Sequence, residues 1–401
     1  YLYAVLLVDV DRFKNVNDSM GHHIGDELLV QLSQRLTSCV KARDMVARFA
    51  GDEFIILLDD VAKQSEASEI AKRIQEKIMW PFSLNDQEVY ITSSIGITLG
   101  TRQYKTPSEI LRDADIALHR SKEQGKARHE FFSTGMFQFA IARMRIENDL
   151  RKVIDRGEIQ LNYQPIVDLA SGTLNGFEAL VRWHHPEIGM ISPGEFIPVA
   201  EEMGAIIEIG RFALRTACEQ MVEWLRTQGP YAPKMISVNL SSRQFADPDL
   251  VASIETIVQQ AGLDPGCLKL EITESALIEN NDVATEVLAQ LQRLGIRLAL
   301  DDFGTGYSSL AYLHRFPVSY LKIDRSFVRR ISGQVGRDAI VQTIVTLAHN
   351  LQMQVIAEGI ETAEQLIALR SIDCHYGQGY YFGKPMTAER ATALIQENRV
   401  W

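Results

Sequence analysis

The sequence from Gly157 to Trp401 repeats one pattern, in which a short apolar run ends in a polar residue and an amphipathic stretch follows. The apolar runs fit buried strands, and the stretches between them, such as Gly210 to Thr227 and Val283 to Leu294, have the apolar spacing of helices. Alternating strands and helices over this length predict a parallel barrel of the TIM, or (β/α)8, type. In such barrels, functional residues collect at the carboxyl ends of the strands.

The polar residues at these predicted strand ends are mostly acids. They include Glu178, Asn239, Glu271, Asp301, Asp302, Lys322, Asp324, Glu358 and Gln378. Five of these carboxylates would lie around one mouth with Lys322 as the one obvious positive partner: Glu178, Glu271, Asp301, Asp302 and Glu358. They would repel one another at neutral pH unless cations lay among them. Oxygen ligands without histidine or thiolate favour Mg2+ or Mn2+, and so many shared acids favour two ions. Structural ion pairs remain the alternative for any single member of the set.

Two adjacent acids, Asp301 and Asp302, follow the apolar run that starts at Ile296. Adjacent residues of a strand point to opposite faces, so both carboxylates can reach one cation only where the strand ends and the backbone turns. Gly304 and Gly306 favour such a turn. A lone Asp that caps a helix after a buried strand would be the plain alternative.

The first third of the chain predicts a smaller α+β domain. A buried strand from Ala4 to Val8 ends in acids, a polar loop covers Asn17 to Asp26, and a helix with apolar positions from Leu28 to Leu36 follows. The remaining predicted elements are strands 46–49 and 54–58 joined by an acidic hairpin, a helix 67–79, a strand 89–98 and a helix that begins near Pro107. This order predicts a ferredoxin-like, split βαβ layout with carboxylates of two strands at one edge.

The expected domain boundaries are 1–132 for the first domain, 133–156 for a helical linker and 157–401 for the barrel. Apolar residues between Phe139 and Ile154 have helical spacing, and Gly157 would end that helix. Such a helix could transmit a signal between the domains or act as a plain spacer.

Composition narrows the cellular setting. The net charge of −11 and the lack of a basic run make nucleic acid an unexpected partner. The four cysteines lie far apart, which argues against a thiolate zinc site or a disulfide framework and fits a reducing cytoplasm. No apolar run approaches the roughly 20 residues needed to span a bilayer. Because the chain begins at Tyr1 inside a strand-like run, we expect a cytoplasmic fragment of a longer protein, membrane-anchored or not, that lacks its upstream sensor.

Residues 3–128 resemble the GGDEF family of diguanylate cyclases through the runs Asp9-Val10-Asp11-Arg12-Phe13-Lys14 and Ala50-Gly51-Asp52-Glu53-Phe54. The resemblance implies a nucleotide and magnesium site to which eight residues contribute. Asp9, Asp52 and the Val10 carbonyl would hold Mg2+ with Glu53 beside them, Lys14 and Lys122 would approach phosphates, and Asn17 and Asp26 would recognise a guanine. Magnesium prefers such hard oxygen ligands, and a triphosphate needs both metal and lysine.

Three departures from the GGDEF pattern bear on activity. Ala50 replaces the first glycine of the signature turn, where we expect a positive φ that costs alanine about 1 kcal/mol. Lys126 and Ala127 replace the usual Arg-Asn, and Lys41 with Asp44 replaces the inhibitory Arg-x-x-Asp. The expectation is a domain that binds GTP with Mg2+ and has weak or no cyclase activity. A relict scaffold without a ligand is the alternative.

Residues 161–389 resemble the EAL family of cyclic-di-GMP phosphodiesterases. The motifs are Tyr-Gln164-Pro, Glu178-Ala-Leu-Val-Arg182-Trp, Val-Asn239-Leu, Glu271-Ile-Thr-Glu274, Asp301-Asp302-Phe-Gly, Leu-Lys322-Ile-Asp324, Ala-Glu358-Gly-Ile-Glu361 and Gly-Gln378-Gly. The resemblance implies a modified TIM barrel whose catalytic residues are Glu178, Asp301, Asp302, Lys322 and Glu358. One cation would be held by Glu178, Asn239, Glu271 and Asp301, and the other by Asp301, Asp302 and Glu358.

The same resemblance implies roles for the remaining residues. Lys322 would steady the attacking water, and Glu274 would brace the loop after Asp302. Substrate would be contacted, or the site framed, by Gln164, Arg182, Asp324, Glu361 and Gln378. Tyr380-Tyr381-Phe382 is most simply explained as core packing.

The expected function is hydrolysis of cyclic di-GMP to linear pGpG with two cations that activate a water, regulated by a GTP-binding first domain. One alternative is a bifunctional cyclase and phosphodiesterase. The other is a module that binds cyclic di-GMP without cutting it. A homodimer through the EAL domain is expected because the family often forms one.

Overall fold

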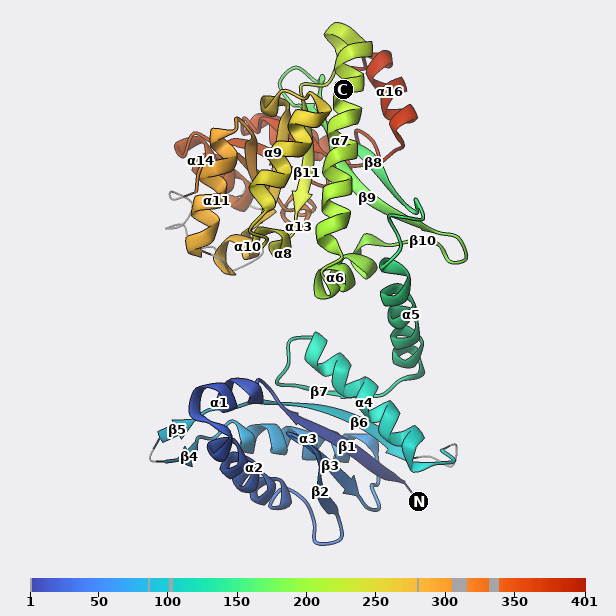
Figure 1. The fold of residues 1–401 in the computed structure, drawn as a ribbon, viewed down its shortest axis with the longest axis vertical. Coiled ribbons are helices and arrows are strands. Elements are labelled where there is room, and N and C mark those ends of the chain that lie inside the picture. The colour runs from blue at the N-terminus through green and yellow to red at the C-terminus, as the bar shows by residue number, and fades with distance from the viewer. Residues whose placement is uncertain (1, 86, 101–103, 280, 305–315, 332–338) are drawn as a thin grey trace. The chain divides into compact units, whose positions relative to one another are not determined.

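The structure is a computed structural model that describes residues 2–85, 87–100, 104–279, 281–304, 316–331 and 339–401 (Figure 1). The chain divides into two compact units, Tyr1–Arg145 and Ile146–Trp401, with the boundary inside helix α5 (Thr134–Leu150). Each unit has its own hydrophobic core.

Unit Tyr1–Arg145 is built on a five-stranded sheet in the order β2-β3-β1-β6-β7. The strands are β1 (Tyr3–Val10), β2 (Met45–Ala50), β3 (Glu53–Leu58), β6 (Ser93–Gly100) and β7 (His129–Phe131). β1 is antiparallel to β3 and β6, whereas β7 is parallel to β6. A separate hairpin pairs β4 (Phe82–Leu84) with β5 (Gln87–Val89).

Helices cover both faces of this sheet. Successive side chains of a strand point to opposite faces, so β1 contributes to two apolar clusters. Val5 and Leu7 pack with α4 (Pro107–Glu123), and Leu6 packs with α2 (His22–Thr37) and α3 (Gln64–Ile78) on the other face. The predicted α+β, ferredoxin-like layout is confirmed.

Two expectations for this unit are wrong. The stretch predicted as a polar loop forms α1 (Phe13–Met20) and the start of α2, with Gly21 between them at a φ of 87°. The helical signal was present in Phe13, Val16 and Met20, which pack against the core, but polar residues between them obscured it. The predicted strand 89–98 is interrupted, because β5 ends before β6 begins.

Unit Ile146–Trp401 contains a closed eight-stranded barrel in the order β8-β9-β11-β12-β13-β14-β15-β16, and β10 extends β9 outside it. The strands are β8 (Ile159–Asp168), β9 (Leu174–His185), β10 (Gly189–Ile191), β11 (Met235–Leu240), β12 (Leu268–Thr273), β13 (Arg297–Phe303), β14 (Tyr320–Ile323), β15 (Gln354–Ala357) and β16 (Tyr376–Gln378). The predicted modified TIM barrel is confirmed.

One strand departs from the parallel arrangement that the repeat pattern predicted. β8 is antiparallel to both of its neighbours, β9 and β16. Only the short segment 169–173 joins β8 to β9, and parallel neighbours need a long crossover that this segment cannot supply. The first two strands therefore form a hairpin.

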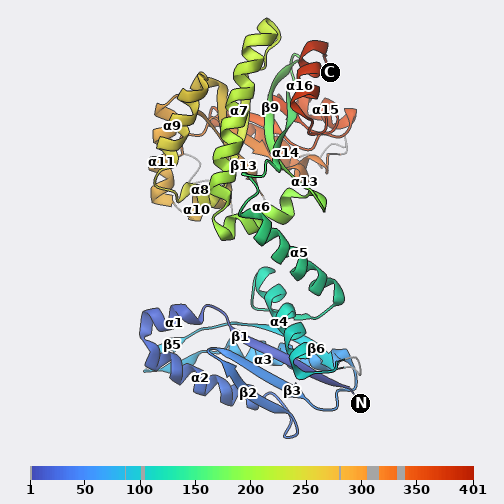
Figure 2. The ribbon, with the colours of Figure 1, turned by 45° about the vertical axis from the view of Figure 1, so that its right-hand side comes forward.

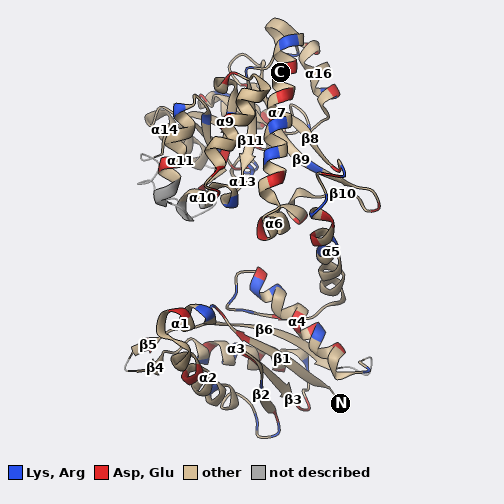
Figure 3. Ribbon diagram, in the orientation of Figure 1, with Lys and Arg blue, Asp and Glu red and all other residues tan. Residues whose placement is uncertain are grey.

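Helices surround the barrel (Figures 1 and 2). They are α6 (Pro193–Met203), α7 (Ile206–Gln228), α8 (Ser242–Phe245), α9 (Leu250–Ala261), α10 (Glu274–Glu279), α11 (Asn281–Arg293), α13 (Arg325–Val328), α14 (Ala339–Asn350), α15 (Ala363–Ser371) and α16 (Ala388–Glu397). Charges of both signs alternate along exposed helix faces (Figure 3), as in the Arg211–Glu208 pair of α7. No helix in the described ranges is long and apolar enough to cross a bilayer.

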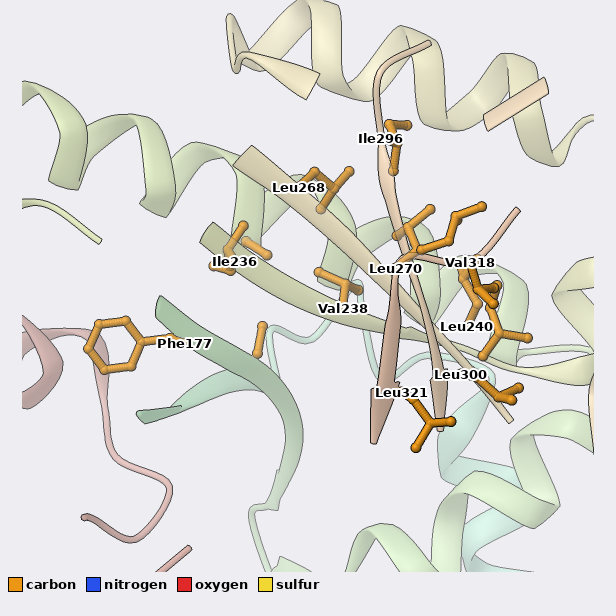
Figure 4. Close-up of a cluster of buried hydrophobic side chains, with 14 of the residues drawn as sticks. Phe177, Ile236, Val238, Leu240, Leu268, Leu270, Ile296, Leu300, Val318 and Leu321 are labelled. Carbon is orange, nitrogen blue, oxygen red and sulfur yellow. The ribbon is translucent and has the colours of Figure 1, made fainter. Parts of the chain in front are cut away.

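The barrel strands alternate between an apolar outer face and a partly polar inner face. In β12, Leu268, Leu270 and Ile272 join the main apolar cluster, of which Figure 4 shows part. The intervening residues Lys269 and Glu271 are buried as well, and both are charged. The period of two therefore directs charged side chains into the barrel interior.

The connector helix differs from its expected bounds. α5 ends at Leu150, and turns rather than helix occupy residues 151–157. Ile146 and Leu150 pack with Trp183 and Phe196 in an apolar cluster of the second unit. These contacts attach the carboxyl end of α5 to the barrel unit.

Candidate active site

A cavity of about 510 Å3 opens among the carboxyl ends of the barrel strands, within the size range of small-molecule sites. Its lining includes the predicted residues Gln164, Glu178, Arg182, Asn239, Asp301, Asp302, Lys322, Asp324, Glu358, Glu361 and Gln378. Arg325, Arg329 and Tyr380 also line it and were not predicted. The barrel thus brings together residues from six strands, β8, β9, β11, β13, β14 and β16, and from the segments that follow β14, β15 and β16.

The adjacent acids Asp301 and Asp302 both line the cavity because the end of β13 is irregular. The pairing of β13 with β14 shifts register between Leu300 and Phe303, and Asp302 has a left-handed φ of 54°. Such a bulge redirects a side chain that regular strand geometry would place on the opposite face. The Asp302 amide donates a hydrogen bond to Asp301 Oδ1 at 2.9 Å, which fixes the pair.

Lys322 lies at the centre of the acidic cluster. Its Nζ is 2.5 Å from Glu271 Oε2, 2.6 Å from Glu358 Oε1, 3.1 Å from Asp301 Oδ2 and 3.9 Å from Glu178 Oε1. Lys322 and Glu271 are each about 1% exposed, so water screens little of their interaction. One ammonium balances only part of the charge of four carboxylates.

The pKa values of the cluster reflect this shortage of positive charge. Burial raises the pKa of Glu178, and burial raises that of Glu358 to about 8 although Lys322 opposes the change. Burial alone would raise the pKa of Glu271, but Lys322 and Lys269 outweigh it and the pKa is lowered. Burial would lower the pKa of Lys322, yet the surrounding carboxylates raise it well above its ordinary value.

The residues present fit divalent cations. Oxygen atoms of Asp301, Asp302 and Glu358 all lie within 4.8 Å of one another, close enough for one ion to contact all three. Glu271 Oε1 is buried and accepts no hydrogen bond within the described structure, and Lys269 Nζ lies 3.5 Å from it. Asn239 lines the cavity, and its Nδ2 donates to Glu178 Oε1 at 2.7 Å. The candidate metal ligands are thus carboxylate oxygen atoms and a side-chain amide, which suit magnesium and manganese.

Buried amides fix the orientation of Glu178. Gln378 Nε2 donates to Glu178 Oε2 at 2.5 Å and to Gln164 Oε1 at 3.0 Å. Gln164 pairs with Glu178 in the β8–β9 register, so both strands support this contact. Gln164 and Gln378 thus frame the Glu178 carboxylate.

The other predicted substrate residues lie toward the cavity entrance. Arg182 is half-buried, and burial lowers its pKa. Asp324 accepts a hydrogen bond from the Ser326 amide at 2.9 Å and so also caps α13. Glu361 forms an ion pair with Arg329 at 3.5 Å. The guanidinium groups of Arg182 and Arg329 both line the cavity, where an anionic ligand would meet them.

Several expectations for this site need correction or cannot be examined. Tyr380 is 59% exposed at the cavity rather than in the core, whereas Phe382 is 4% exposed as expected. Lys322 is not the sole positive partner, because Lys269 Nζ is 3.5 Å from Glu271 Oε1. The sequence indicated Lys269 by its position two residues before Glu271, because residues two apart in a strand share one face. Glu274 begins α10, and the loop that it was expected to brace, 305–315, lies outside the described residues.

The first unit also gathers its predicted acids. Asp9, the next-to-last residue of β1, lies opposite Glu53 in the β1–β3 register, and Lys122 Nζ is 2.7 Å from Asp9 Oδ2. Burial raises the pKa of Asp9, and burial with the charge of Asp9 raises that of Glu53. Asp52 follows Gly51 in the turn between β2 and β3, and Val10 is buried beside Asp9. These acids lie at one edge of the sheet.

The residues predicted to recognise a guanine lie on α1 and α2. Asn17 Oδ1 is buried without a hydrogen-bond partner in the described structure, which is uncommon for a buried acceptor. Gly25 makes room for it, because a Cβ there would lie 2.0 Å from this oxygen. Asp26 and Lys14 are exposed nearby on the two helices.

The expectation of a strained Ala50 is wrong. Ala50 ends β2 and is not among the described non-glycine residues with positive φ. The left-handed position is taken by Gly51, at a φ of 47°. The strain lies instead at Lys126 and Ala127, with φ values of 63° and 49°.

Comparison with known proteins supports both units. The family model of the EAL domain matches residues 147–385, and that of the diguanylate cyclase GGDEF domain matches residues 1–128. The chain is 40% identical over 393 residues to the bifunctional diguanylate cyclase/cyclic di-GMP phosphodiesterase MucR of Pseudomonas aeruginosa, covering 98% of this chain and 57% of that protein. It is 38% identical over 385 residues to the cyclic di-GMP phosphodiesterase PdeR of Escherichia coli, covering 96% and 58%.

Solved structures agree with this assignment. The PaMucR phosphodiesterase in complex with c-di-GMP has a TM-score of 0.59 and 42% identity, covering 62% of this chain and 99% of that one. The EAL enzyme Bd1971 bound to cAMP and cyclic di-GMP has a TM-score of 0.61 and 27% identity, covering 98% and 95%. The chain spans about half the length of the curated relatives it matches, 57% of the first and 48% of the second. The chain belongs to the EAL domain family, and a GGDEF domain precedes its EAL domain.

Proposed function

We propose that the unit Ile146–Trp401 hydrolyses cyclic di-GMP to linear pGpG and requires two divalent cations, Mg2+ or Mn2+. The observation that carries the proposal is the cluster of Glu178, Glu271, Asp301 and Glu358 around one ammonium group, in a cavity large enough for a nucleotide. Relatives named as cyclic di-GMP phosphodiesterases support the choice of substrate.

The donor set divides between two cation positions that share Asp301. One would be held by Glu178, Asn239, Glu271 and Asp301, and the other by Asp301, Asp302 and Glu358. When bound, the cations supply activation of a water and compensation of charge on the phosphodiester. Calcium should support binding better than hydrolysis because it accepts looser geometry.

The protein's own side chains bind and orient the substrate. Arg182 lines the cavity and Arg329 lies at Glu361, so both can contact the anionic phosphates. Asp324 and Glu361 offer acceptors for N–H groups of the bases. The surrounding carboxylates raise the pKa of Lys322, which favours its protonated form, and we assign it the role of holding the attacking water through a hydrogen bond.

For the unit Tyr1–Arg145 we propose GTP and Mg2+ binding that regulates the phosphodiesterase. The acids Asp9, Asp52 and Glu53 meet at one edge, and the buried oxygen of Asn17 is suited to a guanine. Ala50 adds no backbone strain, so the variant signature alone does not exclude cyclase activity. The relative MucR is named as bifunctional.

The test is incubation of the chain with Mn2+ and either cyclic di-GMP or GTP, followed by separation of the nucleotides. Release of pGpG from cyclic di-GMP supports the proposal. Formation of cyclic di-GMP from GTP supports a bifunctional enzyme. Tight binding of cyclic di-GMP without turnover contradicts the proposal and supports a non-catalytic binding module.

A variant pair refines this test. Glu178→Ala removes a carboxylate from the cluster and should abolish hydrolysis while circular dichroism stays that of the wild type. Glu208→Ala removes an acid that is 67% exposed on α7 and should retain full turnover. Undiminished hydrolysis by Glu178→Ala would remove this residue from the site.

The assembly and setting are proposals as well. We propose a cytoplasmic enzyme that forms a homodimer through its EAL domain and receives its input from a sensor outside this sequence. Light scattering on the purified chain tests the dimer, for which a monomer mass at high concentration is the contrary result.

A further inference from the structure

A second lysine lies inside the barrel, beside the acidic cluster. β12 places Lys269 and Glu271 on its inward face, and each is about 1% exposed. Lys269 Nζ is 3.5 Å from Glu271 Oε1 and 4.9 Å from the centroid of the Tyr320 ring. The ion pair and the aromatic face both stabilise a buried ammonium.

Folding stability alone does not explain a buried lysine at this position. Tyr320 belongs to an interior cluster that otherwise contains Ile166, Met235, Ala299 and Ile356. A buried ion pair often contributes no more stability than well-packed apolar residues of similar volume, because both charges lose their hydration. A purely structural role would be met equally well by methionine.

The two oxygen atoms of Glu271 have different partners. Oε1 faces Lys269, whereas Oε2 contacts Lys322, the lysine that also contacts Asp301 and Glu358. We propose that Lys269 is a positioning residue: it holds Glu271 Oε1 and thereby directs Oε2 toward the cations of the site. The inference rests on the proposed cation-dependent function and extends it to a residue outside the cavity lining.

The experiment measures Mn2+ affinity directly, by electron paramagnetic resonance of free Mn2+ in the full chain. Lys269→Met removes the charge at nearly constant length, and Lys269→Gln keeps a hydrogen-bond donor. Groups that orient metal ligands typically contribute about 10- to 100-fold in affinity. We expect the Mn2+ Kd to rise by about that factor in Lys269→Met and by less in Lys269→Gln. Turnover of cyclic di-GMP should show a lower kcat with little change in KM.

A double-mutant cycle distinguishes positioning from general damage. If Lys269 acts through Glu271, then Lys269→Met should weaken Mn2+ binding in the wild type but have no further effect in Glu271→Gln. Met235→Leu alters the same interior cluster at constant volume and should keep the wild-type Kd. If circular dichroism shows that Lys269→Met does not fold, Lys269→Gln replaces it in the double-mutant cycle.

The outcomes separate this inference from the proposed function. The positioning role is overturned if the folded Lys269 variants keep the wild-type Mn2+ Kd. It is also overturned if Lys269→Met weakens Mn2+ binding by the same factor in Glu271→Gln as in the wild type. Both results count even if the wild type hydrolyses cyclic di-GMP. A wild type that cuts no cyclic di-GMP, but whose Mn2+ Kd depends on Lys269 through Glu271, overturns the function and supports the positioning role.

Discussion

Asp302 shows how one residue's backbone conformation determines which atoms reach the site. A left-handed φ of 54° is unfavourable for most L-residues, but aspartate and asparagine tolerate it better. The register shift between β13 and β14 begins after the pair Leu300–Leu321, so the neighbouring Asp301 lies within the irregular stretch. Strain of this kind is often found at functional sites.

We therefore predict different stabilities for two substitutions at this position. Asp302→Asn keeps a residue that tolerates the left-handed region, whereas Asp302→Ala adds about 1 kcal/mol of backbone strain. Both should lose hydrolysis, but Asp302→Ala should unfold at lower urea concentration in metal-free buffer. Equal midpoints would show that this φ carries no strain.

The raised pKa of Glu358 predicts that the stability of the metal-free protein depends on pH. That pKa is raised to about 8 from the ordinary 4.5, chiefly by burial. Between these values the folded protein holds a proton that the unfolded chain has released, so stability falls as pH rises through this window. Thermal unfolding in EDTA should show the midpoint fall from about pH 5 to about pH 8.

Two controls belong to this measurement. Glu358→Gln has no carboxylate at this position, so its midpoint should fall less over the same range. Saturating Mn2+ should remove the fall in the wild type, since a cation replaces the proton. A wild-type midpoint that rises across the window would contradict the raised pKa.

Short helices and single strands decide the geometry of both sites. α1 and α2 bring Asn17 against Gly25 in the first unit, and β8 reverses direction to place Gln164 beside Glu178 in the second. Both arrangements depend on contacts between elements. A helix with no buried residue, such as α1, is held in place chiefly by its neighbour.

Gly25→Ala tests the contact between α1 and α2. Alanine in a helix usually gains up to about 1 kcal/mol over glycine. Here the added Cβ would lie 2.0 Å from Asn17 Oδ1, and such overpacking costs about 1–3 kcal/mol. We expect a lower midpoint of unfolding for the first unit and weaker GTP binding by calorimetry.

The matched control is Gly135→Ala in α5. Its Cβ would meet Ser133 Oγ at 3.9 Å, an ordinary contact. This variant should be as stable as the wild type or slightly more stable. A Gly25→Ala protein that behaves the same way would show that α1 moves aside without cost.

The whole chain contains two compact units with separate cores, so unfolding should not follow a single two-state transition. A ligand stabilises the unit that binds it by RT ln(1 + [L]/Kd), which is about 2.7 kcal/mol at one hundred times the Kd. The two ligand classes proposed here should therefore act on different transitions.

Calorimetry of the full chain measures this directly. Mn2+ should raise the transition of Ile146–Trp401, and the shift should vanish in Glu178→Ala. In protein already saturated with Mg2+, GTP should raise the transition of Tyr1–Arg145 by the same amount in the wild type and in Glu178→Ala. A single transition that shifts equally with both ligands would contradict independent units.

The sequence by itself determined the features that depend on local pattern. The period of two in β12 and the 3.6-residue spacing of helices such as α7 follow from each segment's own burial, so the barrel and the α+β sheet were predictable. Polar residues such as Glu178 at the ends of apolar runs marked the site before any contact was known. The resemblance to the EAL family, rather than the pattern itself, predicted which acids would hold each of the two cations.

Tertiary structure alone decided how these segments meet. The pairing of β8 with β16 depends on closure of the barrel, and the bulge that turns Asp302 depends on the register with β14. The second positive charge beside Glu271 comes from Lys269, and only the assembled barrel brings its Nζ to 3.5 Å from Glu271 Oε1. Closure brings together residues distant in sequence, such as Glu178 and Glu358, and the resulting exclusion of water sets their interaction energies.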